Sequence, residues 1–495
     1  METKTTNYKS IFKATSIFGG VQVFNILITL IRSKAVAILL GTAGMGLNGL
    51  FMSGLNLIKS VSSLGISESA VRDISRAHSS EDLDQITTTF TVFSKWIWIT
   101  AALGIVLTVG LSPLLSQFSF GNTSYAFSYI WLSLTFVFGA LSGGIYTLLR
   151  GTRQIKYLAQ ANIFGAIVGL LAALPIFYFY GIQGVVPAII ATAFGNYLVS
   201  LFFINKIKFQ KIKLTWAETF TLGKPMVTLG ISLTVISLLA TGVAFVLSAY
   251  ISKTGNLKDL GLYNAGLAIV DGYVGMVFTA MATDFYPRLS GMIQDDTKWK
   301  QLVNEQAELV LIILTIVLVL LISTTPILIR VLLSKEFLPA QDFIFWSVLA
   351  IPLKGLTWVV GFVVLAKGNN KLFLTIEIAG TLLVLIFNLI FYTYYGINGL
   401  GVAMLISYII FIIMMMTILK SKYSYQFSNE VFKLLFMAIL PLSLCLICIK
   451  WLGYPNAYFA EALIVLLTIS YSIFELNKRM NLKAILIGLK SKIKG

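Results

Sequence analysis

Residues 96–149 read WIWITAALGIVLTVGLSPLLSQFSFGNTSYAFSYIWLSLTFVFGALSGGIYTLL, a run of 54 positions without an acidic or basic side chain. A helix needs roughly 20 apolar residues to cross a lipid bilayer, so this run predicts two membrane-spanning helices. The uncharged runs at 157–205 and 378–419 are also long enough for two helices each. None of the three shows the short alternating segments that are typical of membrane β-barrels.

The same spacing of charges predicts fourteen spans along the whole chain. They fall at 14–31, 35–58, two within 96–149, two within 157–205, then 225–252, 260–282, 309–329, 343–366, two within 378–419, 432–452 and 459–476. Because a backbone in lipid must satisfy its hydrogen bonds internally, we expect an all-α polytopic membrane protein.

The composition of the 495 residues excludes most other classes. Hydrophobic residues make up 57% of the chain and charged residues 12%, and the mean hydropathy is +0.88. A soluble enzyme of this length would need about twice that charged share. Two cysteines and one histidine leave little for metal or thiol chemistry, and there is no Walker motif, so no cofactor is expected.

Lysine and arginine are distributed unequally between alternate ends of the predicted spans. With the N-terminus in the cytoplasm, 28 of the 37 basic residues lie on the inner side and seven on the outer side. This bias predicts that both termini are cytoplasmic. It also explains most of the net charge of +17 without a nucleic-acid partner, and the basic tail 477–495 is expected to rest on anionic membrane lipids.

The chain also repeats itself at an offset of about 215 residues. FYGIQG at 179–184 matches YYGING at 394–399, and Trp131 and Trp346 stand at the same offset. We therefore predict two parallel six-helix lobes, at 11–204 and 222–419, followed by an appended helix pair within 420–476 and a cytoplasmic tail at 477–495. Such repeats are typical of transporters with a site between the halves.

Three charges fall inside predicted spans, the second of which opens at 35–58 and continues past Lys59. Asp271 and Lys354 each lie near the middle of a span, where a charge is expensive and is by default a functional candidate. The alternative is a structural Asp271–Lys354 ion pair. Lys59 either lines a cavity or extends its amine to the cytoplasmic surface.

Other charges mark the ends of the predicted spans. Arg32 and Lys34 end the first span on the outer side, as an anchor pair or as the rim of an anion cavity. Arg150 and Arg153 flank a glycine at an inner end, where topology or phosphate binding accounts for them. Repeat-matched pairs are expected as helix-end salt bridges or gate latches: Glu68 with Arg72, and Asp284 with Arg288.

Two remaining features are expected to be structural. Cys445 and Cys448 form a C-x-x-C motif within an apolar run, which favours packing over redox chemistry. His78 is expected in a solvated loop.

The chain resembles a known family of membrane transporters. LLGTAGMGLNGL at 39–50, SSLGISESAVR at 62–72 and LLRGTRQ at 148–154 resemble the first half of O-antigen translocases. LGLYNAGLAIVDGYVGMVFTAMATDFYPRLS at 260–290 and VVGFVVLAKGNNKLFLTIEI at 359–378 resemble lipid-linked oligosaccharide flippases of the enterobacterial common antigen (lipid III) type. These belong to the multidrug/oligosaccharidyl-lipid/polysaccharide exporter superfamily.

This resemblance implies a function and a location. The substrate would be an undecaprenyl diphosphate-linked oligosaccharide, moved from the cytoplasmic to the periplasmic leaflet of a bacterial inner membrane by alternating access. A polysaccharide polymerase and a chain-length regulator would be its protein partners. The candidate substrate-binding residues are Arg32, Lys34, Lys59, Arg150, Arg153, Asp271, Arg288, Lys354 and Lys367.

Two other functions compete with this one. A cation-coupled multidrug exporter of the same superfamily would favour acidic and aromatic linings, whereas lysines outnumber acids inside the spans. A membrane polymerase or glycosyltransferase would need a sizeable extramembrane domain, and the longest predicted segments between spans, 68–95 and 283–308, are short. In the rocking mechanism, the inner helix ends near Arg72 and Arg288 meet in the outward-facing state.

Overall fold

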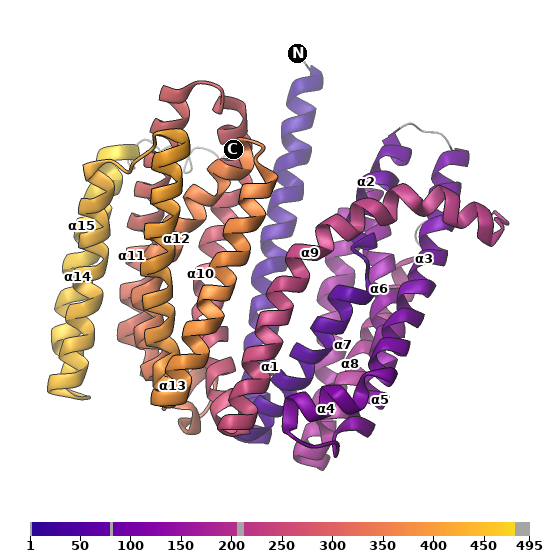
Figure 1. Cartoon of the computed structure of the whole chain (residues 1–495), viewed down its shortest axis with the longest axis horizontal. Coiled ribbons are helices and arrows are strands. Elements are labelled where there is room, and N and C mark those ends of the chain that lie inside the picture. The colour runs from indigo at the N-terminus through magenta and orange to yellow at the C-terminus, as the bar shows by residue number, and fades with distance from the viewer. Residues whose placement is uncertain (1, 80–82, 205–211, 481–495) are drawn as a thin grey trace. The chain divides into compact units, whose positions relative to one another are not determined.

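The structure is a computed structural model that describes residues 2–79, 83–204 and 212–480. Within these residues it contains helices and turns but no strand (Figure 1). The helices are α1 (Glu2–Ser62), α2 (Ile66–Ser79), α3 (Leu83–Gly110), α4 (Ser112–Phe120), α5 (Ala126–Leu132), α6 (Leu134–Gly151), α7 (Ile155–Tyr180), η1 (Gly181–Gly184), α8 (Val185–Ile204), α9 (Trp216–Thr254), α10 (Leu257–Met292), α11 (Asp296–Leu332), η2 (Lys335–Phe337), α12 (Ala340–Ala366), α13 (Asn370–Tyr423), α14 (Asn429–Leu452) and α15 (Ala457–Met480).

Eleven segments of the described chain are long and apolar enough to cross a membrane. Four of them contain a break in the helix, and in Ala126–Gly151 it separates α5 from α6. Ile155–Ile204 comprises α7 and α8, Ile28–Ser62 is kinked at Gly41, and Asn370–Tyr423 is kinked at Gly396. The predicted all-α polytopic fold is therefore confirmed, while the number of fourteen spans stays a prediction.

The chain divides into two compact units. Unit 1 comprises Met1–Gly261 with Leu332–Ser334, and unit 2 comprises Leu262–Val331 with Lys335–Gly495. Packing thus groups α9 with α1–α8, whereas the sequence places the start of the second lobe at residue 222. The lobe boundaries stay a prediction.

Three glycines in the left-handed region set where long helices bend or break. Gly41 has φ 64° and ψ −168°, Gly181 has φ 52° and ψ −133°, and Gly396 has φ 59° and ψ −145°. Residues with a Cβ are strained at such angles, so glycine fixes these positions. Gly181 and Gly396 are 215 positions apart, within the two matched FYGIQG and YYGING motifs.

The bend at Gly41 corrects the predicted end of the first span. Arg32 and Lys34 do not end a helix, because α1 continues through them to the kink. No glycine or proline stands between the two predicted spans at 32–34 to break the backbone. His78 likewise lies in the last turn of α2 and not in a loop, although it is exposed as expected.

The turns between α6 and α7 and between α12 and α13 have the same backbone hydrogen bonds. The Arg153 amide donates to the Arg150 carbonyl at 3.1 Å, and 215 positions later the Gly368 amide donates to the Leu365 carbonyl at 3.0 Å. Four neighbouring bonds of the two turns recur at the same offset. Both turns also contain one left-handed residue, Arg153 with φ 56° and Gly368 with φ 71°. This equivalence supports the predicted repeat.

Gly46 and Gly261 lie where α1 crosses α10 within unit 1, and they too are 215 positions apart. A Cβ on Gly46 would lie 1.9 Å from the carbonyl oxygen of Leu257, and a Cβ on Gly261 would lie 1.9 Å from that of Thr42. Thr42 and Leu257 share the 215 offset, so the contact is the same from both sides. The crossing therefore has the local two-fold relation that a parallel repeat predicts.

A capping box fixes the start of α9 at Trp216, six residues before the predicted lobe boundary. The Thr215 hydroxyl accepts from the Glu218 amide, and the Glu218 carboxylate accepts from the Thr215 amide at 2.7 Å. These hydrogen bonds from Thr215 hold the pKa of Glu218 below its usual value. Two of the four backbone amides that a helix start leaves unpaired are thereby satisfied.

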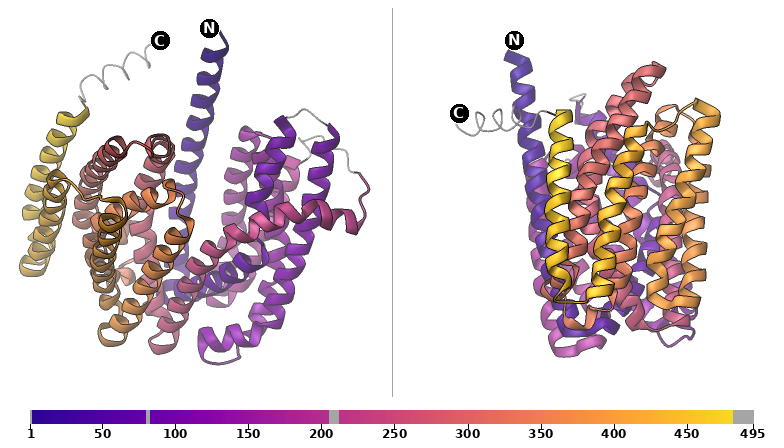
Figure 2. Two further views of the ribbon diagram at one scale, coloured as in Figure 1. Left: turned by 45° about the horizontal axis from the view of Figure 1, so that its top comes forward. Right: turned by 90° about the vertical axis from the view of Figure 1, so that its left-hand side faces the viewer.

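Helices α14 and α15 lie side by side (Figures 1 and 2), where the sequence predicts an appended helix pair. Arg479 at the end of α15 ties this pair to α11. Its Nε donates to Glu308 of α11 at 2.6 Å, and its Nη1 and Nη2 pair with Glu475 and Glu430. One guanidinium thus bridges carboxylates from three helices.

Candidate functional site

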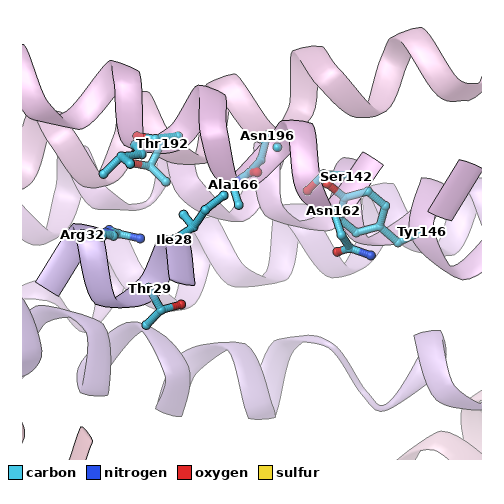
Figure 3. Close-up of a pocket in the computed structure, with 12 residues that line it drawn as sticks. Ile28, Thr29, Arg32, Ser142, Tyr146, Asn162, Ala166, Thr192 and Asn196 are labelled. Atoms are coloured by element: carbon cyan, nitrogen blue, oxygen red, sulfur yellow. The ribbon is translucent and has the colours of Figure 1, made fainter. Parts of the chain in front are cut away.

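A cavity of about 330 Å³ lies inside unit 1, among α1, α6, α7 and α8 (Figure 3). Every helix that lines it belongs to a segment able to span a membrane. Seven of its twelve lining residues carry a side-chain hydrogen-bonding group, and one of these seven is charged. The seven are Thr29, Arg32, Ser142, Tyr146, Asn162, Thr192 and Asn196.

Some of these groups already have partners in their own helices or a neighbour. The Asn162 amide donates to the Leu158 carbonyl at 2.9 Å, and the Ser142 hydroxyl donates to the Gly139 carbonyl at 3.2 Å. Thr192 bridges α8 to α7, because its hydroxyl donates to the Gly169 carbonyl at 3.3 Å. These residues hold the cavity wall together.

Arg32, Tyr146 and Asn196 differ from those residues. Over the described part of the chain, none of the three side chains has a hydrogen-bond or ion-pair partner. Unused donors that face a cavity inside a membrane bundle are costly unless water or a ligand satisfies them. The cavity therefore presents a guanidinium, a phenol and a carboxamide to whatever occupies it.

Two glycines of α7 make room for this polar wall. A Cβ on Gly165 would lie 2.5 Å from Asn196 Oδ1 and 3.2 Å from the Tyr146 hydroxyl. A Cβ on Gly169 would lie 2.9 Å from the methyl group of Thr192. Glycine at these positions lets side chains from α6 and α8 reach the backbone of α7.

The structure separates Arg32 from Lys34, which the sequence treats as one pair. Arg32 lines the cavity, whereas Lys34 is exposed and lies outside the lining. Two positions along a helix correspond to about 200° of rotation, so the two side chains point in nearly opposite directions.

A second polar cluster lies in unit 2. Lys354 Nζ of α12 and Asp271 Oδ1 of α10 are 3.6 Å apart, and their side chains are 29% and 58% exposed. Tyr408 of α13 lies within electrostatic reach of both and of Glu377. The predicted ion pair thus forms, but it is longer than a direct hydrogen bond and open on one side.

The other candidate residues lie outside both sites. Lys59, Arg150 and Arg153 are exposed at helix ends. Arg288 pairs with Asp284 at 3.1 Å as predicted, whereas Arg72 pairs with its neighbour Asp73 at 2.8 Å and not with Glu68.

Lys367 makes its contacts with other residues of unit 2. Its amine donates to the Ile293 carbonyl at 2.9 Å and lies 5.0 Å from the centre of the Trp299 ring. These contacts join the end of α12 to the α10–α11 turn, so this lysine has a structural explanation.

The neutral residues of the cavity were not predicted, because the distribution of charge does not mark them. Asn162, Thr192 and Asn196 all lie within the uncharged run 157–205. Their spacing carried the signal: Thr192 and Asn196 share one face of α8, and Asn162 shares a face of α7 with Gly165 and Gly169.

A bundle of membrane helices with a polar cavity inside it defines a polytopic membrane transporter, and similar solved structures share this fold. A lipid II flippase MurJ in an inward closed conformation matches with a TM-score of 0.64 at 15% identity, over 94% of this chain and 99% of that one. An inward-facing MATE family transporter of the MOP superfamily matches with a TM-score of 0.69 at 15% identity, over 81% and 94%.

The sequence places the protein more narrowly. A family model described as "Polysaccharide biosynthesis protein" matches residues 35–342, and the chain belongs to this family. The lipid III flippase of Escherichia coli (strain K12) is 21% identical over 395 residues, which cover 77% of this chain and 91% of the relative.

Proposed function

We propose that the protein is a flippase that moves an undecaprenyl diphosphate-linked oligosaccharide from the cytoplasmic to the periplasmic leaflet of a bacterial inner membrane. This proposal rests mainly on the unit 1 cavity, in which Arg32 is the one charged group among neutral hydrogen-bonding side chains. A guanidinium binds phosphate oxygens through paired donors, and amides and hydroxyls suit sugar hydroxyls. The likeness to a lipid III flippase over most of its length supports this substrate class.

The size of the cavity limits what it holds. Its volume of about 330 Å³ lies at the lower end of small-ligand sites, which run from about 300 to 1,000 Å³. It therefore accommodates part of the head group, the diphosphate with the sugar next to it, while the polyprenyl chain stays in lipid. Alternating access, cytoplasmic termini, and a polymerase and chain-length regulator as partners are part of the same proposal.

A multidrug exporter is the second candidate, since MATE transporters share the fold. A site for organic cations would favour carboxylates, and none of the twelve described residues that line the cavity is acidic. The charge of the cavity therefore favours an anionic head group.

The test compares two neighbouring cations in the native bacterium. Deletion of the gene should abolish a surface polysaccharide and leave its lipid-linked precursor on the cytoplasmic side. Arg32→Ala removes a charged hydrogen-bond donor worth about 1.5–3 kcal/mol, so export should fall roughly tenfold to a hundredfold. Lys34→Ala, the matched control outside the cavity, should restore export when both proteins are present at wild-type level.

Two results would count against the proposal. A deletion strain that keeps all its surface polysaccharides would exclude the flippase function. Equal export by Arg32→Ala and Lys34→Ala would show that the unit 1 cavity does not bind the substrate.

A further inference from the structure

Glu461, near the start of α15, is a buried carboxyl group without a hydrogen-bond partner among the described residues. The residue is 1% exposed, and neither carboxyl oxygen has a hydrogen bond within the described part of the chain. The hydroxyl of Tyr454, in the turn between α14 and α15, is also buried and unpaired there. An ionisable side chain inside a membrane span is by default a functional candidate.

The side chains with which Glu461 interacts electrostatically are uncharged. Those within its electrostatic reach are Tyr454 in the turn, Tyr458 of α15 and Cys445 of α14, whose neighbour Cys448 lies on the same helix. Two cations lie in this region. Arg330 of α11 acts on Tyr458, and Lys450 lies over the Trp346 ring at 5.2 Å. Neither makes an ion pair with Glu461 among the described residues.

Glu475, a second buried carboxyl group on α15, differs from Glu461 because it has an ion-pair partner. Glu475 is 3% exposed, and Arg479 pairs with it directly. Burying an ionised carboxylate without such a partner is so costly that the group takes up a proton instead. Glu475 therefore has a reason to be ionised, and Glu461 does not.

We propose that Glu461 is a proton-binding site, at which the folded protein holds a neutral carboxylic acid. This site lies on α15 of unit 2, and it does not depend on the proposed function. Its ligand is a proton, which can leave only if the carboxylate that remains gains water or a cation.

Infrared spectroscopy of the full-length protein in liposomes tests this directly. At neutral pH the wild type should show the carbonyl band of a protonated carboxyl group, and Glu461→Gln should lose it. Glu475→Gln, the matched control, should keep the band. A wild-type spectrum whose acid band is unchanged by Glu461→Gln would overturn the proposal.

A chemical probe covers the case in which Glu461→Gln does not fold. Dicyclohexylcarbodiimide enters lipid and reacts with the protonated acid, which adds across a C=N bond; the product rearranges to a stable N-acylurea with no atom lost. Mass spectrometry of the labelled wild type should find this adduct on Glu461, fading as the pH is raised, and not on Glu475. Labelling of Glu475 with Glu461 unmodified would contradict the assignment.

Discussion

At the scale of single residues, variants of Lys354 and Asp271 show whether the two form a ligand site or only a structural ion pair. Their 3.6 Å separation and the exposure of Asp271 leave the lysine accessible to a competing anion. We expect Lys354→Ala to abolish export while the protein level stays normal. We also expect Asp271→Ala combined with Lys354→Ala to remain inactive, because the double variant still lacks the phosphate ligand.

The opposite result has a clear meaning. If the pair only neutralises two charges, removing both is better tolerated than removing one, because no unpaired charge remains. Export restored in the double variant would therefore make Lys354 a structural residue. Both variants are measured by surface polysaccharide in the deletion strain.

Single residues were predictable from the sequence where their chemistry is local. Asp271 and Lys354 stand out because charge is rare inside apolar runs, and the pair forms. Arg32 drew attention as a basic residue at the outer end of a predicted span, but Asn196 and Tyr146 did not. Neutral polar residues are common in membrane helices, and only the packing of four helices shows which of them share a cavity.

Among the helices, the attachment of α14 and α15 depends on Arg479. Its side chain is 17% exposed and bridges Glu308, Glu430 and Glu475. Removing one partner of a buried ion pair leaves the other charges uncompensated, at a cost of about 3 kcal/mol or more. We expect Arg479→Ala to lower the melting temperature of the purified protein by several degrees and to expose α15 to protease.

Lys433→Ala serves as its control. Lys433 also pairs with Glu430, but at 3.9 Å and with both side chains about half exposed. Such surface pairs contribute roughly 0–1 kcal/mol, so this variant should melt like the wild type. If Arg479→Ala has the same melting temperature as Lys433→Ala, the Arg479 bridge does not hold α14 and α15 in place.

Helix positions were predictable to the extent that charge and hydropathy set them. The predicted spans 432–452 and 459–476 correspond to α14 and α15, because polar residues flank each apolar run. The kink at Gly41 was not predicted, since a glycine among small residues also suits close packing. Whether a glycine packs or bends is decided by its φ angle, which composition does not encode.

At the scale of the whole molecule, the Gly46–Gly261 crossing joins two positions that are 215 residues apart, the offset of the predicted repeat. A Cβ at either position would meet a backbone oxygen at 1.9 Å, and backbone cannot move aside as a side chain can. We expect Gly46→Ala and Gly261→Ala each to destabilise the protein by about 1–3 kcal/mol. Thermal unfolding of the purified variants measures this.

Gly143→Ala in α6 is the matched control, because nothing lies within 4 Å of the added Cβ. It should be neutral or stabilising by up to about 1 kcal/mol, since alanine favours a helix. Equal melting of all three variants would show that the crossing tolerates an extra methyl group.

The symmetry of that crossing also bears on how such a chain could arise. Thr42 and Gly46 of one helix meet Leu257 and Gly261 of the other by the same contact in both directions, as in an isologous interface. A half-length ancestor with a small residue at this position would need only a second copy of itself to form the crossing. Joining the two copies in one gene would then have freed each half to diverge, one keeping an arginine cavity and the other a lysine–aspartate pair.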